Sequence, residues 1–227
     1  MLETFYQDVL KDWATQERRI LGHVILAPPI NSGNRYTEDW AIIEIDSSKV
    51  NASNFESNAI DLGTNIPPHK FLSMICANLP DFPFEYPIDD HLLRLEDTIP
   101  YGEMCHSTVY DVPYLMVIKC GGTTGLTIGR ANNLCSYARH NYNDDQAKTV
   151  KEWAILSFDS KSGAFSAKGD SGSVIVDKLG RIGGLITSGT GTTESLDITY
   201  ATPISFLLKA MEDSGLMNPN IHPVLTV

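Results

Sequence analysis

A polar, glycine-rich loop runs directly into a short apolar segment, and this junction constrains the fold more than any other part of the chain. The loop begins at Lys168 and reads Lys-Gly-Asp-Ser-Gly-Ser, and Val174-Ile175-Val176 follows it. Glycine adopts positive φ without steric cost, so Gly169 and Gly172 let the backbone turn on both sides of Ser171. A serine presented in this way beside backbone N–H groups has the geometry of a nucleophile with an oxyanion hole.

Strand-like segments surround this loop throughout the second half of the chain. Apolar, β-favouring runs predict strands over 114–119, 126–129 and 153–158, and a glycine-rich turn over 121–125 joins the first two. After the serine loop, 180–189 predicts a turn and a strand, and 197–203 leads into a helix over 204–211. The second half is therefore predicted to be all-β and to end in a C-terminal helix.

The serine loop and the strand after it resemble the second barrel of the chymotrypsin-like (trypsin-like) serine proteases. Gly-Asp-Ser-Gly stands at 169–172, Gly-Leu-Ile-Thr-Ser-Gly at 184–189, and the match covers most of 114–213. The resemblance implies an all-β, chymotrypsin-like double β-barrel whose C-terminal barrel is complete and whose N-terminal barrel is partial. It also implies that Ser171 is the nucleophile, with the N–H groups of Gly169 and Ser171 as the oxyanion hole.

The same resemblance predicts where a peptide substrate would bind. Substrate would lie along Thr187, Ser188 and Gly189 as an added strand, because an exposed strand edge offers its backbone groups to an extended peptide. Phe165 and Ser166 would lie near the base of the specificity pocket, and Gly189 on its wall. No acidic residue occurs from 163 to 168, so an uncharged side chain is expected in that pocket.

The first half of the chain gives weaker patterns. Apolar residues at helical spacing predict an amphipathic helix over 2–17, and 20–27 and 39–46 predict two strands. Asp39 heads the second of these and resembles the triad aspartate of the family, although a loop-capping role is the alternative. We expect residues 47–112 to finish the first barrel and cross to the second, which gives domains of 1–112 and 113–227.

A serine nucleophile needs a general base, and no histidine of this sequence stands where the family places its catalytic histidine. In the family the chain order is His, Asp, Ser, yet only His23 precedes Asp39, and it lies inside a predicted strand. The other five are expected to be surface or loop histidines: His69, His91, His106, His140 and His222. The chain therefore resembles an N-terminally shortened form of intracellular fungal trypsin-like proteins. A protease-fold module that binds peptide or protein without cleaving it is the alternative.

Composition and charge limit the kinds of binding partner and the cellular compartment that we expect for this protein. The formal charge is −11, the pI is about 4.9 and no Lys/Arg cluster occurs, so a nucleic-acid partner is not expected. No stretch is a leader or a membrane span, which predicts no membrane association and an intracellular, cytoplasmic protein. Cys76, Cys105, Cys120 and Cys135 are expected to be free thiols. No cofactor or metal is predicted, and nothing indicates an oligomeric state.

A different hydrolase class shares part of the pattern. Ser171, Asp197 and His222 occur in the Ser–Asp–His order of the α/β-hydrolases. That fold needs Gly-x-Ser-x-Gly between a strand and a helix, whereas the fifth position here is Ser173 and a strand follows. The local sequence therefore excludes this alternative.

Overall fold

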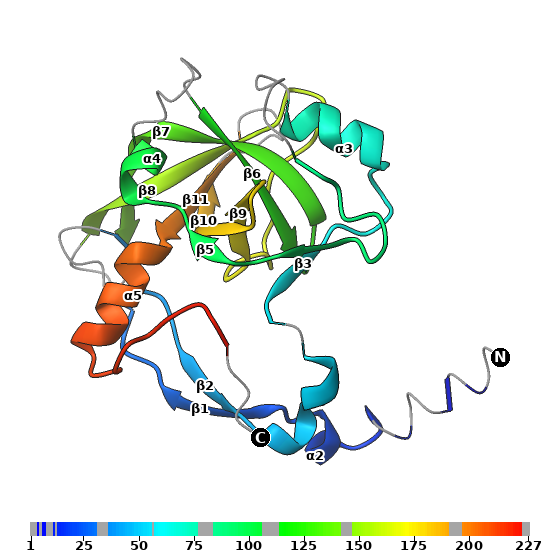
Figure 1. Cartoon of the computed structure of the whole chain (residues 1–227). Coiled ribbons are helices and arrows are strands. Elements are labelled where there is room, and N and C mark those ends of the chain that lie inside the picture. Colours follow the sequence, from blue (N-terminus) through cyan, green and yellow to red (C-terminus); the bar gives the residue numbers. More distant parts are fainter. Residues whose placement is uncertain are drawn as a thin grey trace. The chain divides into compact units, whose positions relative to one another are not determined.

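The computed structural model describes residues 4, 6–7, 11, 13–30, 36–55, 57–76, 84–105, 114–141, 147–190 and 197–223 (Figure 1). The chain divides into two compact units, one of Met1–Pro29, Trp40–Glu56 and Leu225–Val227 and one of Ile30–Asp39 and Ser57–Val224. The predicted domain boundary at 112/113 and most of the helix predicted over 2–17 lie outside the described residues. Both remain predictions.

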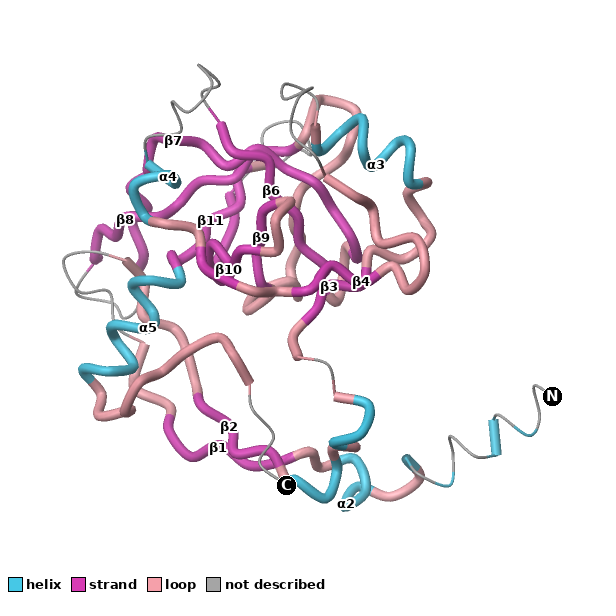
Figure 2. Tube along the Cα trace, in the orientation of Figure 1, coloured by secondary structure: helices cyan, strands magenta, loops and turns pink. Residues whose placement is uncertain are grey.

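A closed ring of strands forms the core of the larger unit. Its members are β6 (Tyr114–Gly121), β7 (Gly125–Asn141), β8 (Ala147–Ser157), β9 (Val174–Asp177), β10 (Arg181–Thr190) and β11 (Ile198–Pro203). The neighbours run β11-β8-β7-β6-β9-β10, and β10 pairs back with β11, so the sheet closes on itself (Figures 1 and 2). Every pairing in the ring is antiparallel. The all-β class and the complete second barrel are confirmed.

The inside of the ring is filled by a cluster to which all of its strands contribute. Its members are Val117, Ala131, Trp153, Ile155, Ile175, Ile186 and Ala201 on the strands, with Ile99, Met104 and Phe165 from connecting segments. Successive side chains of a strand point to opposite faces. Val117 accordingly belongs to this interior cluster, while Met116 and Ile118 belong to a second one.

The second cluster lies outside the ring and binds the remaining elements of the unit to it. It joins Met116, Ile118 and Val176 to β3 (Ala59–Asp61), β4 (Leu92–Arg94) and the helix α3 (Pro68–Ile75). β3 and β4 form a separate antiparallel pair, and β5 (Asp97–Thr98) adds to β10 in parallel. The helices α4 (Tyr101–Cys105) and α5 (Ile204–Asp213) complete the unit. The predicted C-terminal helix is therefore present.

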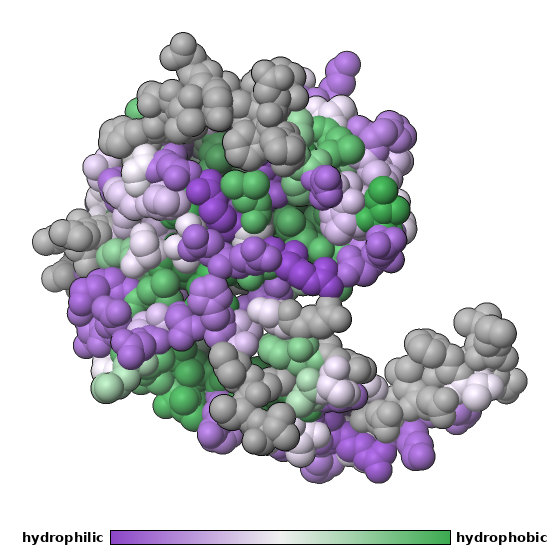
Figure 3. Space-filling model, in the orientation of Figure 1, coloured by the Kyte–Doolittle hydropathy of each residue, from purple (hydrophilic) through white to green (hydrophobic). Residues whose placement is uncertain are grey.

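The smaller unit contains α2 (Gln16–Arg19) and an antiparallel pair of strands, β1 (Gly22–Leu26) and β2 (Ile42–Ile45). Two 3₁₀ turns follow at Ser47–Lys49 and Ala52–Asn54. Val24, Ile43 and Ile45 share one face of the pair and are 56–59% exposed. Figure 3 shows apolar surface in the region of β1 and β2. His23 lies in β1, as predicted.

Two of the predicted strands are much longer in the structure. β7 runs to Asn141, and β8 begins at Ala147, whereas sequence patterns ended or began them near 129 and 153. Their extensions are rich in polar residues such as Asn133 and Arg139, so hydrophobic alternation is weak there. Within the described residues no helix is long and apolar enough to cross a membrane. Among the described residues, Cys76 and Cys120 are free thiols, and Sγ of Cys135 lies 3.6 Å from the hydroxyl of Tyr36.

Candidate functional site

The serine loop is held in place by main-chain hydrogen bonds to β10. Gly169 and Gly172 have φ of +105° and +83°, conformations that only glycine adopts easily. The N–H of Gly172 donates to the carbonyl of Ile186 at 2.7 Å, and the N–H of Ile186 donates to the carbonyl of Ser173 at 3.0 Å. The loop thus extends the β9–β10 pairing, with Ser171 exposed at its tip.

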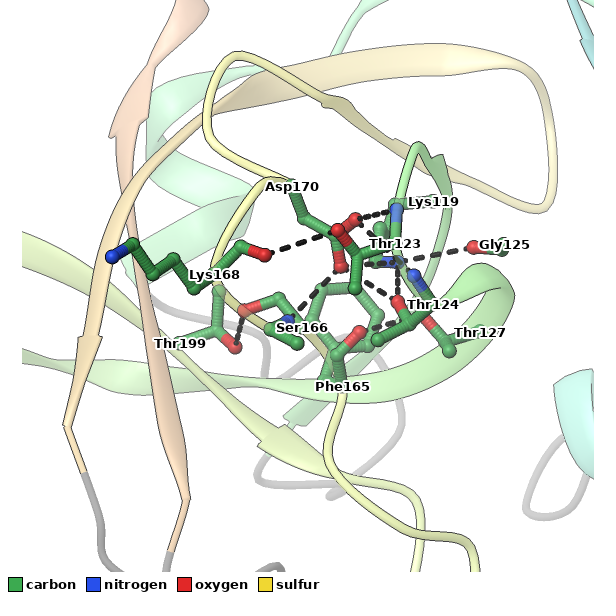
Figure 4. Close-up of polar contacts among 11 residues, drawn as sticks. Lys119, Thr123, Thr124, Gly125, Thr127, Phe165, Ser166, Lys168, Asp170 and Thr199 are labelled. Carbon is green, nitrogen blue, oxygen red and sulfur yellow. Dashed lines mark hydrogen bonds and ion pairs between the residues drawn. The ribbon is translucent and has the colours of Figure 1, made fainter.

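Asp170 anchors the loop to the hairpin between β6 and β7 (Figure 4). Its side chain is fully buried, and its carboxylate accepts from the N–H groups of Thr123 at 2.8 Å and Ala167 at 3.0 Å. The hydroxyl of Thr124 donates at 2.7 Å, and Nζ of Lys119 lies 3.2 Å away. The residue before the serine therefore ties together segments almost fifty positions apart in sequence.

The environment of Asp170 and Lys119 keeps them as a buried ion pair. Burial acts to raise the pKa of Asp170, but the hydrogen bonds from Thr124, Ala167 and Thr123 together outweigh it and hold the pKa well below its ordinary value. Burial lowers the pKa of Lys119, and the hydrogen bond to Asp170 opposes this shift. Lys119 also donates to the carbonyl of Gly125 at 3.0 Å. The pair is charged and hydrogen-bonded on both sides.

Ser171 lies beside an irregularity in β10. Its hydroxyl is 3.5 Å from the carbonyl oxygen of Thr187, and Thr187 falls where the β10–β11 register shifts. Among the described residues, the N–H groups of Gly169 and Ser171 donate to no acceptor. β9 pairs β10 only up to Leu185, so Thr187, Ser188 and Gly189 have β11 on one side and no described strand on the other. This arrangement can receive both an oxyanion and an extended peptide.

The residues predicted to form the specificity pocket lie around Thr199. The hydroxyl of Ser166 is 2.7 Å from that of Thr199, and Gly189 pairs with Thr199 across β10 and β11. Phe165 is only 1% exposed and packs in the barrel interior. A methyl group at Gly189 would lie 3.8 Å from the carboxylate of Asp197, whose pKa burial raises. Asp197 is an acidic neighbour that the 163–168 stretch does not contain.

Neither Asp39 nor any histidine side chain that the structure describes is bonded to this site. Asp39 is exposed, and in the described part of the chain no histidine hydrogen-bonds to it or to Ser171. His23 pairs instead with Glu44 at 3.3 Å, and Nδ1 of His91 lies 3.2 Å from the hydroxyl of Tyr86. The histidines 69 and 222 are exposed. His106 and the side chain of His140 lie outside the described residues.

Glu152 is a buried acid that the sequence did not reveal. It is 0% exposed, and Oε1 accepts from the hydroxyl of Thr37 at 2.6 Å while Oε2 lies 3.5 Å from the hydroxyl of Thr187. The carbonyl of Thr37 in turn accepts from Thr202 at 2.8 Å. Burial outweighs the two hydrogen bonds and raises the pKa of Glu152 to about 7. The segment leading to Asp39 is thereby tied to the strand beside Ser171.

The described residues contain no candidate metal-binding site. Within the described ranges, no three His, Cys, Asp or Glu side chains come close enough together to hold an ion. The reacting groups that remain are a hydroxyl, backbone N–H groups and buried carboxyls.

Solved structures similar to this chain include proteases. Protease A of Thermobifida fusca is 21% identical over 53% of each chain, with a TM-score of 0.37, so the match spans about half of that protein. The chymotrypsin of Cellulomonas bogoriensis is 19% identical over 53% of this chain and 54% of its own, also with a TM-score of 0.37. A glutamic-acid-specific serine protease is 14% identical over 85% of this chain and 72% of its own, with a TM-score of 0.48.

No protein-family model and no curated protein matches the sequence. The all-β assignment therefore stands on the closed ring of strands itself.

Proposed function

We propose that this protein is a serine-protease-fold hydrolase that acts on peptides through Ser171. The observation that carries the proposal is the loop geometry: an exposed serine between two positive-φ glycines, with the N–H groups of Gly169 and Ser171 unused by described acceptors. Those two N–H groups would stabilise the oxyanion formed when the serine oxygen attacks a peptide carbonyl. The peptide would pair with Thr187, Ser188 and Gly189.

The proton of Ser171 needs an acceptor, and none of the described histidines is bonded to this serine. We therefore expect the 227-residue chain to react slowly. Removing the base from a serine protease costs on the order of a million-fold in turnover, while the oxyanion hole and binding retain about a thousand-fold over water. Asp39 would orient a histidine once one reaches the serine.

A fluorophosphonate probe tests the nucleophile directly. We expect slow labelling at Ser171 that Ser171→Ala abolishes, and Ser160→Ala, an exposed loop serine, serves as the matched control. Replacement of each histidine by alanine should leave the labelling rate unchanged. A single replacement that stops fast labelling would identify a base and overturn the expectation of slow reaction.

A second candidate function follows because none of the described histidines contacts Ser171. In that case the protein is a peptide-binding module that keeps the strand edge of β10 and performs no cleavage. The two functions separate in one measurement: a binding module binds extended peptides and shows no Ser171 labelling above that of a denatured sample, whereas a hydrolase labels only when folded.

The side chain that the pocket accepts is a further part of the proposal. We expect the pocket to accept an uncharged side chain from the peptide residue that precedes the scissile bond. The reason is that burial raises the pKa of Asp197 and disfavours its charged form. Profiling with a peptide library checks this. A preference for Arg or Lys that Asp197→Asn abolishes would show instead that the Asp197 carboxylate is the counter-charge.

A further inference from the structure

A buried hydrogen-bond network joins the segment before Asp39 to the strands β8, β10 and β11, which are neighbours in the ring (Figure 1). Its centre is Glu152 on β8, which is 0% exposed. Oε1 of Glu152 accepts from the hydroxyl of Thr37 at 2.6 Å, at the short end of the range for hydroxyl donors. The carbonyl of Thr37 accepts from the hydroxyl of Thr202 on β11 at 2.8 Å. Thr37 is thereby held through both its side chain and its main chain.

The network also reaches β10 at an irregular point of that strand. Oε2 of Glu152 lies 3.5 Å from the hydroxyl of Thr187, and the same hydroxyl lies 3.3 Å from the carbonyl oxygen of Tyr200 on β11. The register of the β10–β11 pair shifts between Ile186 and Ser188, on either side of Thr187. A register shift interrupts the regular ladder of main-chain hydrogen bonds. Side-chain bonds therefore fix the strand at the position where its ladder is irregular.

Thr187 is the residue through which this network meets the serine loop. Its carbonyl oxygen is 3.5 Å from the hydroxyl of Ser171. The preceding residue, Ile186, exchanges main-chain hydrogen bonds with the loop: its carbonyl accepts from Gly172 at 2.7 Å, and its N–H donates to the carbonyl of Ser173 at 3.0 Å. A displacement of β10 at this point would therefore move the loop and its serine.

A carboxyl group at position 152 specifies the arrangement of its neighbours more closely than an apolar side chain would. A buried carboxyl is costly unless hydrogen-bond donors are in place, so the folded state favours the geometry that supplies them. Thr37 is only 5% exposed and Thr202 is 0% exposed, so water does not readily replace these donors. The network thus couples burial of Glu152 to one position of the segment at Thr37 and one position of β10.

We propose that Glu152 is a positioning residue for Ser171: it holds Thr37 and Thr187 in one arrangement and so sets where the serine hydroxyl and the peptide-binding edge of β10 lie. This role rests on the proposed hydrolase function and deepens it. Glu152 is fully buried, so it acts through Thr187 and not by contact with the peptide. The same carboxyl also fixes the chain two residues before Asp39, the residue expected to orient a histidine.

Two matched pairs of variants test the proposal. Glu152→Met and Thr37→Val keep the approximate size of the side chain but remove its hydrogen bonds, whereas Glu152→Gln and Thr37→Ser keep a hydrogen-bonding group at the same place. We expect the first variant of each pair to lower the fluorophosphonate labelling rate of Ser171 at saturating probe on the order of tenfold, because a small misplacement of a nucleophile is costly. The second variant of each pair should label at close to the wild-type rate.

Two further variants separate this effect from a general loss of stability. Phe71→Leu removes packing from the cluster outside the ring, where Phe71 on α3 is 0% exposed, and Thr149→Val changes an exposed residue of β8. Both should label normally under conditions in which urea unfolding shows every variant to be folded. Normal labelling of Glu152→Met and Thr37→Val, or an equal slowing by Phe71→Leu, would overturn the proposal.

An NMR measurement distinguishes failure of this role from failure of the proposed function. The amide resonances of Ser171 and Gly172 report the position of the loop whether or not the serine reacts. They should shift in Glu152→Met and Thr37→Val and return towards their wild-type positions in Glu152→Gln and Thr37→Ser. If the wild type labels no faster than a denatured sample but these shifts occur, the hydrolase function fails and the positioning role stands. Unchanged resonances would show that Glu152 does not position the serine.

Discussion

Two carboxyl groups are completely buried at different places in the same barrel, and their surroundings shift their pKa values in opposite directions. Asp170 receives N–H and hydroxyl donors and the ammonium of Lys119, and its pKa is lowered. Glu152 receives the hydroxyls of Thr37 and Thr187, and its pKa is raised to about 7. Burial alone does not decide ionisation. Hydrogen-bond donors and nearby charges also shift the pKa.

A permanently charged anchor suits the serine loop, because its position then does not change over the physiological pH range. The carboxyl of Glu152 instead titrates near neutrality while it connects Thr37 to Thr187, on the strand next to Ser171. The serine loop is expected to be rigid, and the hydrogen bonds of Glu152 to Thr37 and Thr187 are expected to be sensitive to pH.

The largest effect is expected from Asp170→Asn. This change leaves Lys119 buried without its counter-charge, which costs about 3–5 kcal/mol for a buried pair. Urea unfolding measures the loss, and labelling of Ser171 should fall with it because the loop is released from Thr123 and Thr124. Asp89→Asn, an exposed aspartate in a turn, is the control and should change stability by less than about 0.5 kcal/mol. Equal effects of the two changes would mean that the ion pair does not stabilise the barrel.

The second-largest effect is the pH dependence of folding stability that Glu152 causes. Its folded pKa of about 7 lies above its ordinary value of 4.5, so the folded state holds a proton that the unfolded state releases. Stability is therefore greatest below pH 4.5 as far as this group is concerned, and it falls as pH rises through about 7. The total loss is about 3 kcal/mol.

Urea unfolding of the wild type and Glu152→Gln across this pH range isolates the contribution. The glutamine variant keeps the hydrogen-bonding shape without titrating, so the difference between the two curves should appear between pH 4.5 and 7. Parallel curves would show that Glu152 ionises normally in the folded protein.

A smaller loss of stability is expected from Gly121→Ala, next to the buried carboxylate of Asp170. A methyl group there would lie 2.4 Å from Oδ1 of Asp170, and that carboxylate is held by several donors and cannot move freely. Overpacking of this kind costs about 1–3 kcal/mol. Gly102→Ala in α4 meets no atom within 4 Å and should be neutral or stabilising. Thermal unfolding of both variants checks the contrast.

The smallest effect is expected at Glu44, a carboxyl that is not buried. Its side chain is 65% exposed, and its partner His23 is 72% exposed, so solvent screens the pair. Glu44→Gln should change stability by less than about 0.5 kcal/mol at any pH between 5 and 8. A larger change in unfolding free energy would mean that the β1–β2 pair carries more of the stability than its exposure indicates.

The strands of the second half could be predicted because their signal is local. Apolar, β-favouring runs and glycine turns placed β6, β9 and β10 within a few residues of their observed bounds, and the helix at Ile204–Asp213 was also predicted. Gly169 and Gly172 also have the positive φ that their spacing around Ser171 indicated. Periodicity and backbone freedom are properties of a few neighbouring residues, so the sequence by itself determined these features.

The partners of the buried charges depend on tertiary structure alone. Thr124 and Asp170 are 46 positions apart, and Thr37 and Glu152 are 115 apart, so no local pattern pairs them. Lys119 looks like an ordinary polar residue in a strand, and Glu152 like a solvent-facing one, until tertiary packing covers both side chains. Ring closure encloses Lys119, whereas the segment at Thr37 covers Glu152 on the outer face of the ring. Only when a face of a strand is dry does a carboxyl become an anchor or a titrating group.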